Sequence, residues 1–176
     1  MSETLAIVSD RVETAARALL GRACEADIAI VTAESCTGGL LASLLTDIEG
    51  ASSAFERGFV VYSPEAKCEL LGIARAKIDR CGAVSRDVAE AMAEGALAAS
   101  HGDVAIAITG FAGPAAPEDE PGLVYFACSR RNGPTAHREC HFGDIGRGPT
   151  RLACIEQAVA MLEESVAAAR CVPSGA

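Results

Sequence analysis

The segment from Ile28 to Ala42 contains a serine suited to nucleophilic chemistry. An apolar run ends at Glu34-Ser35-Cys36-Thr37, passes Gly38-Gly39 and resumes as a leucine-rich stretch, a pattern that predicts a buried strand, a tight turn and a helix. Ser35 is therefore expected at the carboxyl end of a strand, where open α/β sheets bind ligands. A hydroxyl there can attack a carbonyl, and the backbone N–H groups that open the next helix can hold the resulting oxyanion.

Two other interpretations of this segment stay open on the sequence alone. In the first, Ser35 or Thr37 only caps the helix and the glycines only make the turn. In the second, Cys36 is the nucleophile, because thiolates react readily near helix N-termini. The second ranks lower, since neighbouring side chains on a strand-like segment point in opposite directions.

A tyrosine and a lysine flank a second predicted junction between a strand and a helix. Residues 58–62 are expected to form a strand, and Ser63-Pro64-Glu65 is a strong helix start, with a serine cap, a proline at the first helical position and an acid in the first turn. Tyr62 then ends the strand, and Lys67 lies one turn into the helix. The structural alternative is a core tyrosine with a hydrated hydroxyl and a solvated lysine.

The remaining pattern predicts a single α/β domain, residues 1–176, with a mixed sheet. Helices are expected at 10–24, from the turn after Ser35 to about residue 47, at 64–71, from a Ser85 cap to about 97, and at 152–166. Strands are expected at 28–32, 58–62, 103–109, 122–129 and 135–142, and the last two form a hairpin around Asn132-Gly133. Residues 115–121 and 143–149 are expected to be loops, and the tail from Cys171 is expected to be frayed.

Composition narrows the class of partner. A net charge of -9 argues against nucleic acid and leaves a small ligand as the expected partner. The first residues lack the basic and apolar regions of a signal peptide, and no apolar run reaches membrane-spanning length, so we expect no membrane association and a cytoplasmic protein. The 8 cysteines are scattered without a C-x-x-C pair and are expected to be reduced and mostly buried. Cys140-His141 near His137 lacks zinc spacing, so no metal is expected.

Four separate motifs in order resemble the CinA C-terminal domain family over about residues 10–169. They are Ala33–Gly39, Phe55–Lys67, Gly82–Ser85 and Thr109–Pro114. The resemblance implies a three-layer α/β/α sandwich with a mixed, mostly parallel sheet, and a protein that self-associates. Members of the family include nicotinamide mononucleotide deamidases, which hydrolyse the carboxamide to give nicotinic acid mononucleotide and ammonia without a metal or other cofactor.

Carried over residue by residue, the resemblance implies that Ser35 is the nucleophile and that Tyr62 and Lys67 activate it. A lysine can act as a base only if burial or nearby positive charge leaves it partly neutral. The resemblance also implies that Thr109 and Gly110 help to place the ligand. Further ligand contacts are expected from the turn after the nucleophile, at Cys36, Thr37 and Gly38.

The chain departs from the family pattern in two loops. Residues 115–121 replace a longer glycine- and serine-rich stretch, and Ile145-Gly146 separates Gly143-Asp144 from Arg147, whereas family members have a compact Gly-Asp-Arg. The four-residue spacing from Arg147 to Arg151 is kept, and we assign both arginines to the phosphate of the substrate. A binding module that has lost turnover through these loops is therefore the alternative to an enzyme.

Overall fold

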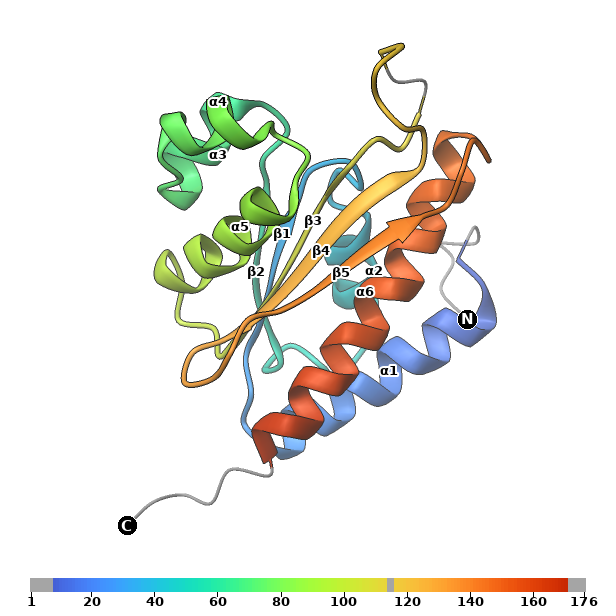
Figure 1. Cartoon of the computed structure of the whole chain (residues 1–176). Coiled ribbons are helices and arrows are strands. Elements are labelled where there is room, and N and C mark those ends of the chain that lie inside the picture. The colour runs from blue at the N-terminus through green and yellow to red at the C-terminus, as the bar shows by residue number, and fades with distance from the viewer. Residues whose placement is uncertain (1–7, 114–115, 171–176) are drawn as a thin grey trace.

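A five-stranded sheet organises the computed structural model, which describes residues 8–113 and 116–170 (Figure 1). The strand order is β2 (Phe55–Val60), β1 (Ile30–Glu34), β3 (Val104–Gly110), β4 (Leu123–Arg130) and β5 (Ala136–His141). β1 pairs in parallel with β2 and β3, whereas β4 is antiparallel to both β3 and β5. All strands except β4 therefore run in the same direction, which confirms the mixed, mostly parallel sheet and the predicted hairpin.

Helices cover both faces of the sheet. One face carries α1 (Asp10–Glu25), α2 (Leu40–Thr46) and α6 (Arg147–Arg170), and the other carries α3 (Pro64–Leu71), α4 (Arg75–Cys81) and α5 (Arg86–Ala98) (Figure 1). The predicted three-layer α/β/α sandwich is confirmed. None of the helices in the described ranges is long and apolar enough to cross a membrane.

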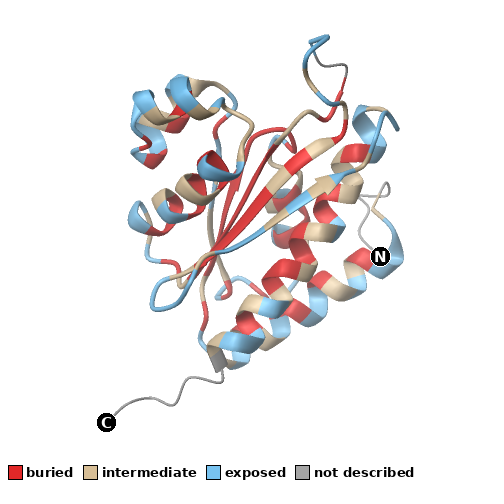
Figure 2. Cartoon of the chain, in the orientation of Figure 1, coloured by how far each residue is buried: buried red, intermediate tan, exposed pale blue. Residues whose placement is uncertain are grey.

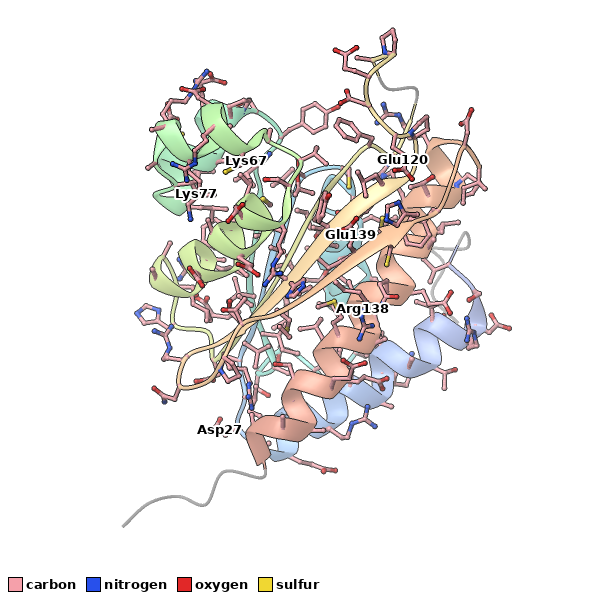
Figure 3. The ribbon with its side chains drawn as sticks, viewed as in Figure 1. Asp27, Lys67, Lys77, Glu120, Arg138 and Glu139 are labelled. Atoms are coloured by element: carbon pink, nitrogen blue, oxygen red, sulfur yellow. The ribbon has the colours of Figure 1, made fainter. Side chains whose placement is uncertain are left out.

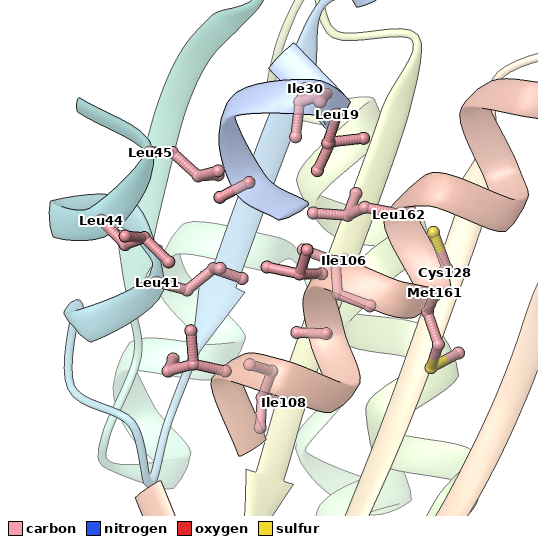
Figure 4. Packing of buried hydrophobic residues seen from close by; sticks show 14 of the residues in the cluster. Leu19, Ile30, Leu41, Leu44, Leu45, Ile106, Ile108, Cys128, Met161 and Leu162 are labelled. Atoms are coloured by element: carbon pink, nitrogen blue, oxygen red, sulfur yellow. The ribbon is translucent and has the colours of Figure 1, made fainter. Parts of the chain in front are cut away.

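The central strand β3 shows how the sequence builds two cores. Its side chains alternate, so that Val104, Ile106 and Ile108 face α1, α2 and α6, while two alanines face α5. The branched side chains pack against buried leucines of the three helices (Figure 4). Truncating such a leucine to alanine costs about 2–5 kcal/mol. On the other face, the small alanines let α5 lie close to the sheet.

Burial follows this layering (Figure 2). β1 is buried along its whole length, and β3 is buried up to its last residue, because helices cover both faces of these strands. The edge strands β2 and β5 carry intermediate and exposed residues. Two candidate site residues lie at the carboxyl ends of these buried strands: Ser35 directly follows β1, and Thr109 is the last residue but one of β3.

Three predicted boundaries were wrong, and one helix was missed. β1 covers Ile30–Glu34 rather than residues 28–32. β2 covers residues 55–60 rather than 58–62, because Val61 is buried as part of the following loop and its hydrophobicity does not mark strand. The sequence assigned no element to α4, in which Ile78 is the buried residue and the cap lacks a side-chain hydrogen bond. α6 begins at Arg147 rather than Leu152, because Pro149 lies in its first turn, where a missing N–H costs little. The expected tail from Cys171 lies outside the described residues, as do two residues of the loop region, 114–115.

Candidate active site

The carboxyl ends of β1, β2 and β3 meet at one edge of the sheet and open into a cavity of about 260 Å³. The Ser35 N–H donates to the Ile108 carbonyl at 3.0 Å, and the Val61 N–H donates to the Glu34 carbonyl at 2.9 Å. These bonds fix the chain after each strand end. The cavity is lined by Ser35, Cys36, Tyr62, Lys67, Ala83, Val84, Thr109, Gly110, Phe111, Ala112, Gly113 and Arg147.

Ser35 and Lys67 are in direct contact. The Lys67 Nζ donates to Ser35 Oγ at 3.1 Å and to the Val61 carbonyl at 2.9 Å. Both side chains are buried, and Lys67 is 1% exposed. The sequence predicted the strand-end position of Ser35 and the helical position of Lys67, and the structure brings the two together from the end of β1 and from α3. Figure 3 labels Lys67 on α3.

Lys67 lies in surroundings that disfavour its charge. Burial lowers the pKa of the Lys67 ammonium below its usual value, while the nearby Cys36 thiol has the smaller, opposite effect. Within the described residues, no carboxylate forms a salt bridge with Lys67. The fold therefore places a lysine that is prone to lose its proton against a serine hydroxyl.

Glu34, rather than Ser35 or Thr37, caps α2. Its buried carboxylate accepts from the N–H groups of Gly39 at 3.1 Å, Leu41 at 3.1 Å and Ala42 at 2.8 Å. The capping interpretation of Ser35 and Thr37 was therefore wrong, because a carboxylate one residue earlier takes these donors. The hydroxyl of Ser35 is left free of the helix and faces Lys67.

Arg151 lies behind the turn that follows Ser35. Its Nη2 donates to the Thr37 carbonyl, and its buried Nε has no hydrogen-bond partner among the described residues. Gly38 adopts φ 61° and leaves room for the guanidinium, which lies 3.5 Å from where a Cβ would stand. Thr37 is fully buried, and its hydroxyl also lacks a partner in the described part of the chain. Arg151, Thr37 and Gly38 thus form the support of the turn and do not line the cavity.

Arg147 reaches the cavity itself. Its guanidinium lies against Gly113, where an added Cβ would stand 2.9 Å from Nη2, so a larger residue at this position would push the flexible guanidinium aside. In residues 8–113 and 116–170, the Arg147 guanidinium has neither an ion pair nor a hydrogen bond. Arg147 is therefore the arginine available to an anion in the cavity.

Thr109 and Gly110, at the end of β3, form another part of the cavity wall. Thr109 is fully buried, and its hydroxyl donates to the Ala83 carbonyl at 2.9 Å, which ties the end of β3 to the loop between α4 and α5. At Gly110, a Cβ would lie 2.6 Å from Val124 Cγ2, so the residue must be glycine for β4 to pack. Both residues line the cavity, and Thr109 uses its hydroxyl to position the Ala83 loop.

Tyr62 follows β2 by two residues and stands at the cavity mouth. Its side chain is 69% exposed, and its hydroxyl has no hydrogen-bond partner among the described residues. The structural alternative of a core tyrosine was wrong. Tyr62 thus lines the cavity from its exposed side.

Several contributors to the site carried weak sequence signals. Glu34 is a lone acid before a helix, and the Val61 carbonyl has no side-chain signature at all. Ala83 and Phe111 are apolar wall residues that resemble core. A carboxylate immediately before a glycine-rich helix start is the one signal that could have found Glu34 as a cap. Across the described ranges, no group of three or more His, Cys, Asp or Glu side chains is arranged to hold a metal ion.

Comparisons with known proteins agree with this architecture. The sequence profile of the CinA C-terminal domain matches residues 12–166. Nicotinamide-nucleotide amidohydrolase PncC of Escherichia coli K12 is 48% identical over 118 residues, which cover 65% of this chain and 72% of that protein. A CinA-like protein of Akkermansia muciniphila is 47% identical over 121 residues, and the match covers 68% of this chain but 29% of that larger protein.

Solved structures extend the likeness to the whole fold. The competence/damage inducible protein CihA from Agrobacterium tumefaciens superposes with a TM-score of 0.87 at 41% identity, covering 91% of this chain and 98% of that one. A CinA superfamily protein from Escherichia coli superposes with a TM-score of 0.82 at 33% identity, covering 89% of this chain and 93% of that one.

Proposed function

The chain belongs to the CinA C-terminal domain family, and on that premise we propose that it is a serine amidohydrolase acting on the carboxamide of nicotinamide mononucleotide. The contact between Lys67 Nζ and Ser35 Oγ, 3.1 Å long and buried, is the observation that carries the proposal. A binding module has no need to hold a depressed-pKa lysine against a hydroxyl. The likeness to the E. coli amidohydrolase supplies the substrate class.

The proposed reaction begins with neutral Lys67. Lys67 accepts the proton of Ser35 Oγ while that oxygen attacks the carboxamide carbon, and the Val61 carbonyl keeps the amine oriented. Protonated Lys67 then gives its proton to the leaving nitrogen, which departs as ammonia. Water attacks the Ser35 ester with Lys67 again as base, which releases the nicotinic acid nucleotide. Tyr62 acts at the mouth, where its hydroxyl can orient the amide or relay a proton.

Backbone groups of the turn are the proposed oxyanion donors. The N–H groups of Gly39, Leu41 and Ala42 are taken by Glu34, while those of Cys36 and Thr37 donate to no other described residue. These two immediately follow the nucleophile and are therefore assigned to the oxyanion. Arg147 is assigned to the phosphate, for which its free guanidinium in the cavity is suited. A phosphate role for Arg151 stays a prediction, which Arg151→Ala can test.

An ammonia-release assay over a panel of amides tests the function. Nicotinamide mononucleotide should be hydrolysed, with slower release from nicotinamide riboside and none in the Ser35→Ala variant. The alternative, a module that binds without turnover, predicts saturable binding of the mononucleotide by calorimetry and no ammonia from any member of the panel. Self-association and a cytoplasmic location also stay proposals; light scattering after size-exclusion chromatography tests the first.

A further inference from the structure

The connection between β3 and β4 begins in the cavity wall. Its first residues, 111–113, line the cavity, and residues 116–122, here called the return segment, lead back to β4. The Gly122 N–H donates to the Phe111 carbonyl at 2.8 Å, and the Phe111 N–H donates to the Leu123 carbonyl at 2.9 Å. The return segment therefore helps to hold Phe111, and with it this part of the wall, in place.

His141, the last residue of β5, lies between two carboxylates. Its Nδ1 is 2.7 Å from Oε1 of Glu120 in the return segment, and its Nε2 is 3.0 Å from Oε1 of Glu139 on β5 (Figure 3 labels both glutamates). On β4, the residues paired with His141 and Glu139 are Leu123 and Tyr125, which add no charge, because burial and both carboxylates raise the pKa of the Tyr125 hydroxyl. In the described ranges, neither glutamate has an ion pair with any other residue. His141 is therefore the cation that these two carboxylates share.

The protonation state of His141 decides how many of these contacts are hydrogen bonds. An imidazolium donates from both ring nitrogens, whereas a neutral imidazole has one N–H and turns a lone pair toward the other carboxylate. Both carboxylates thus favour the protonated ring, and the pKa of His141 is raised above its usual value, chiefly by the hydrogen bond to Glu120. Because the pKa is raised in the folded chain, the two contacts are complete at low pH and are lost as pH rises through that folded pKa.

We propose that protonated His141 is a pH-sensitive clip that fastens the return segment to β5 and so steadies the Phe111 wall of the cavity. When pH rises through the titration of His141, one ring proton leaves to water and the neutral ring donates to one glutamate only. The charges of Glu120 and Glu139 are then no longer compensated, and their mutual repulsion favours an open return segment. The wall beside the substrate cavity is thereby linked to pH through residues that lie outside the cavity.

Amide hydrogen exchange, followed by ¹⁵N NMR across the titration of His141, tests the clip without any assay of turnover, so its result is independent of the proposed amidohydrolase activity. The protection of the Gly122 amide, taken relative to its intrinsic exchange rate at each pH, should fall about two- to fivefold as His141 loses its proton. The factor is small because the His141 side chain is 54% exposed. The buried Ile106 amide serves as the internal reference and should keep its protection.

The pKa of His141 is read in the same samples. The sequence contains 3 histidines, so three ring Cε1–H signals are expected, and His141→Gln identifies the one that belongs to the clip. That signal should titrate at a higher pH than those of the other two, and Glu120→Gln should lower its pKa, because the substitution removes the charge nearest the ring. The fall in Gly122 protection should coincide with this titration.

Matched variants separate the clip from a general loosening. His141→Gln should show the low Gly122 protection at every pH, whereas His137→Gln, on the same strand and 3.8 Å from Glu90 of α5, should behave as the parent. Glu139→Gln should keep the protection at high pH, because the neutral ring can donate to Glu120 and accept from the new amide NH₂. Gly122 protection that stays constant through the titration of His141 in the parent, or a His141 pKa that Glu120→Gln leaves unchanged, would overturn the proposal.

Discussion

Lys67→Met separates a catalytic lysine from a structural one. Methionine keeps an unbranched apolar stem of similar length but has no amine, so Ser35 loses its base. General-base catalysis contributes about 10²–10⁴-fold, which corresponds to about 3–5 kcal/mol of transition-state stabilisation. We expect kcat to fall by that factor while KM for the mononucleotide changes little, because the amine contacts Ser35 and Val61 in the free protein.

The same substitution should change the free energy of unfolding much less than it changes turnover. The substitution leaves the buried Val61 carbonyl without its donor, at a cost of about 1–3 kcal/mol. It also removes an amine that is buried without a carboxylate partner, which offsets part of that cost. The net change should move the melting temperature by a few degrees, since 1 kcal/mol corresponds to about 2–4 °C for a chain of this size. A hundredfold loss of activity through unfolding would instead leave about 1% of the molecules folded.

The pKa of Lys67 can be measured directly, because the sequence contains two lysines, Lys67 and Lys77. Lysine labelled with ¹³C at Cε should give two side-chain signals, and Lys67→Met and Lys77→Met each remove one (Figure 3). The pKa of Lys67 should lie below the usual value of 10.5, because burial disfavours its charge. kcat/KM in the parent should rise with pH through that pKa, and the rise should be absent in Lys67→Met but present in Lys77→Met.

The sign of the stability change follows from the same shift. Between the lowered folded pKa of Lys67 and its unfolded value, the unfolded chain binds more protons, so stability falls as pH falls through this window. Lys67→Met should lose this dependence. Turnover near the parent level in Lys67→Met, or a Lys67 signal that titrates no lower than that of Lys77, would refute the assignment of Lys67 as the base.

Three further substitutions test the rest of the site. Ser35→Ala should abolish ammonia release with an unchanged melting temperature, whereas Cys36→Ala should retain turnover; the reverse pattern would make the thiol the nucleophile. Arg147→Ala should raise KM for the mononucleotide about ten- to a hundredfold, which is the value of one charge-assisted contact, and should leave KM for the riboside unchanged. Arg151→Ala should instead lower kcat for both substrates. A loss confined to the mononucleotide would show that Arg151 binds the phosphate. Glu34→Gln, which turns an amide NH₂ toward N–H donors, should lower stability by about 1–3 kcal/mol in thermal unfolding; unchanged stability would show that the cap is dispensable.

The local sequence pattern predicted the parts of the fold that combine an apolar run with residues typical of a turn or a helix start. The strand before Ser35, the helix start at Ser63-Pro64 and the Asn132-Gly133 hairpin each carry a strong local signal, and the structure has all three. α4 was missed because Ile78 alone is buried in it, so no apolar periodicity exists to detect. The apolar run that ends at Tyr62 misled for a different reason. Val61 follows β2 but is buried in the core beneath α3 and α5, so its hydrophobicity marks burial and not a strand.

Contacts between side chains were harder to predict from the sequence than helices and strands, because they depend on how segments far apart in the chain pack together. Motif resemblance grouped Ser35 with Lys67, but the burial that lowers the lysine pKa requires α3 to pack over the end of β1. Arg147 and Arg151 look equivalent in sequence, four residues apart in one helix. The helix start at residue 147 sets them at different depths, one in the cavity and the other beneath the turn.

The nucleophile turn joins these observations into one physical account. A helix that begins after a nucleophile offers its first N–H groups to whatever negative charge lies closest. Here that charge is Glu34, which precedes Ser35 and occupies the donors of Gly39, Leu41 and Ala42. A substrate oxyanion must therefore find its donors earlier in the turn, and Arg151 fixes that segment by binding the Thr37 carbonyl. Glu34 and Arg151 thus hold the turn from its two sides, and in the proposed mechanism turnover depends on two charged residues that do not line the cavity.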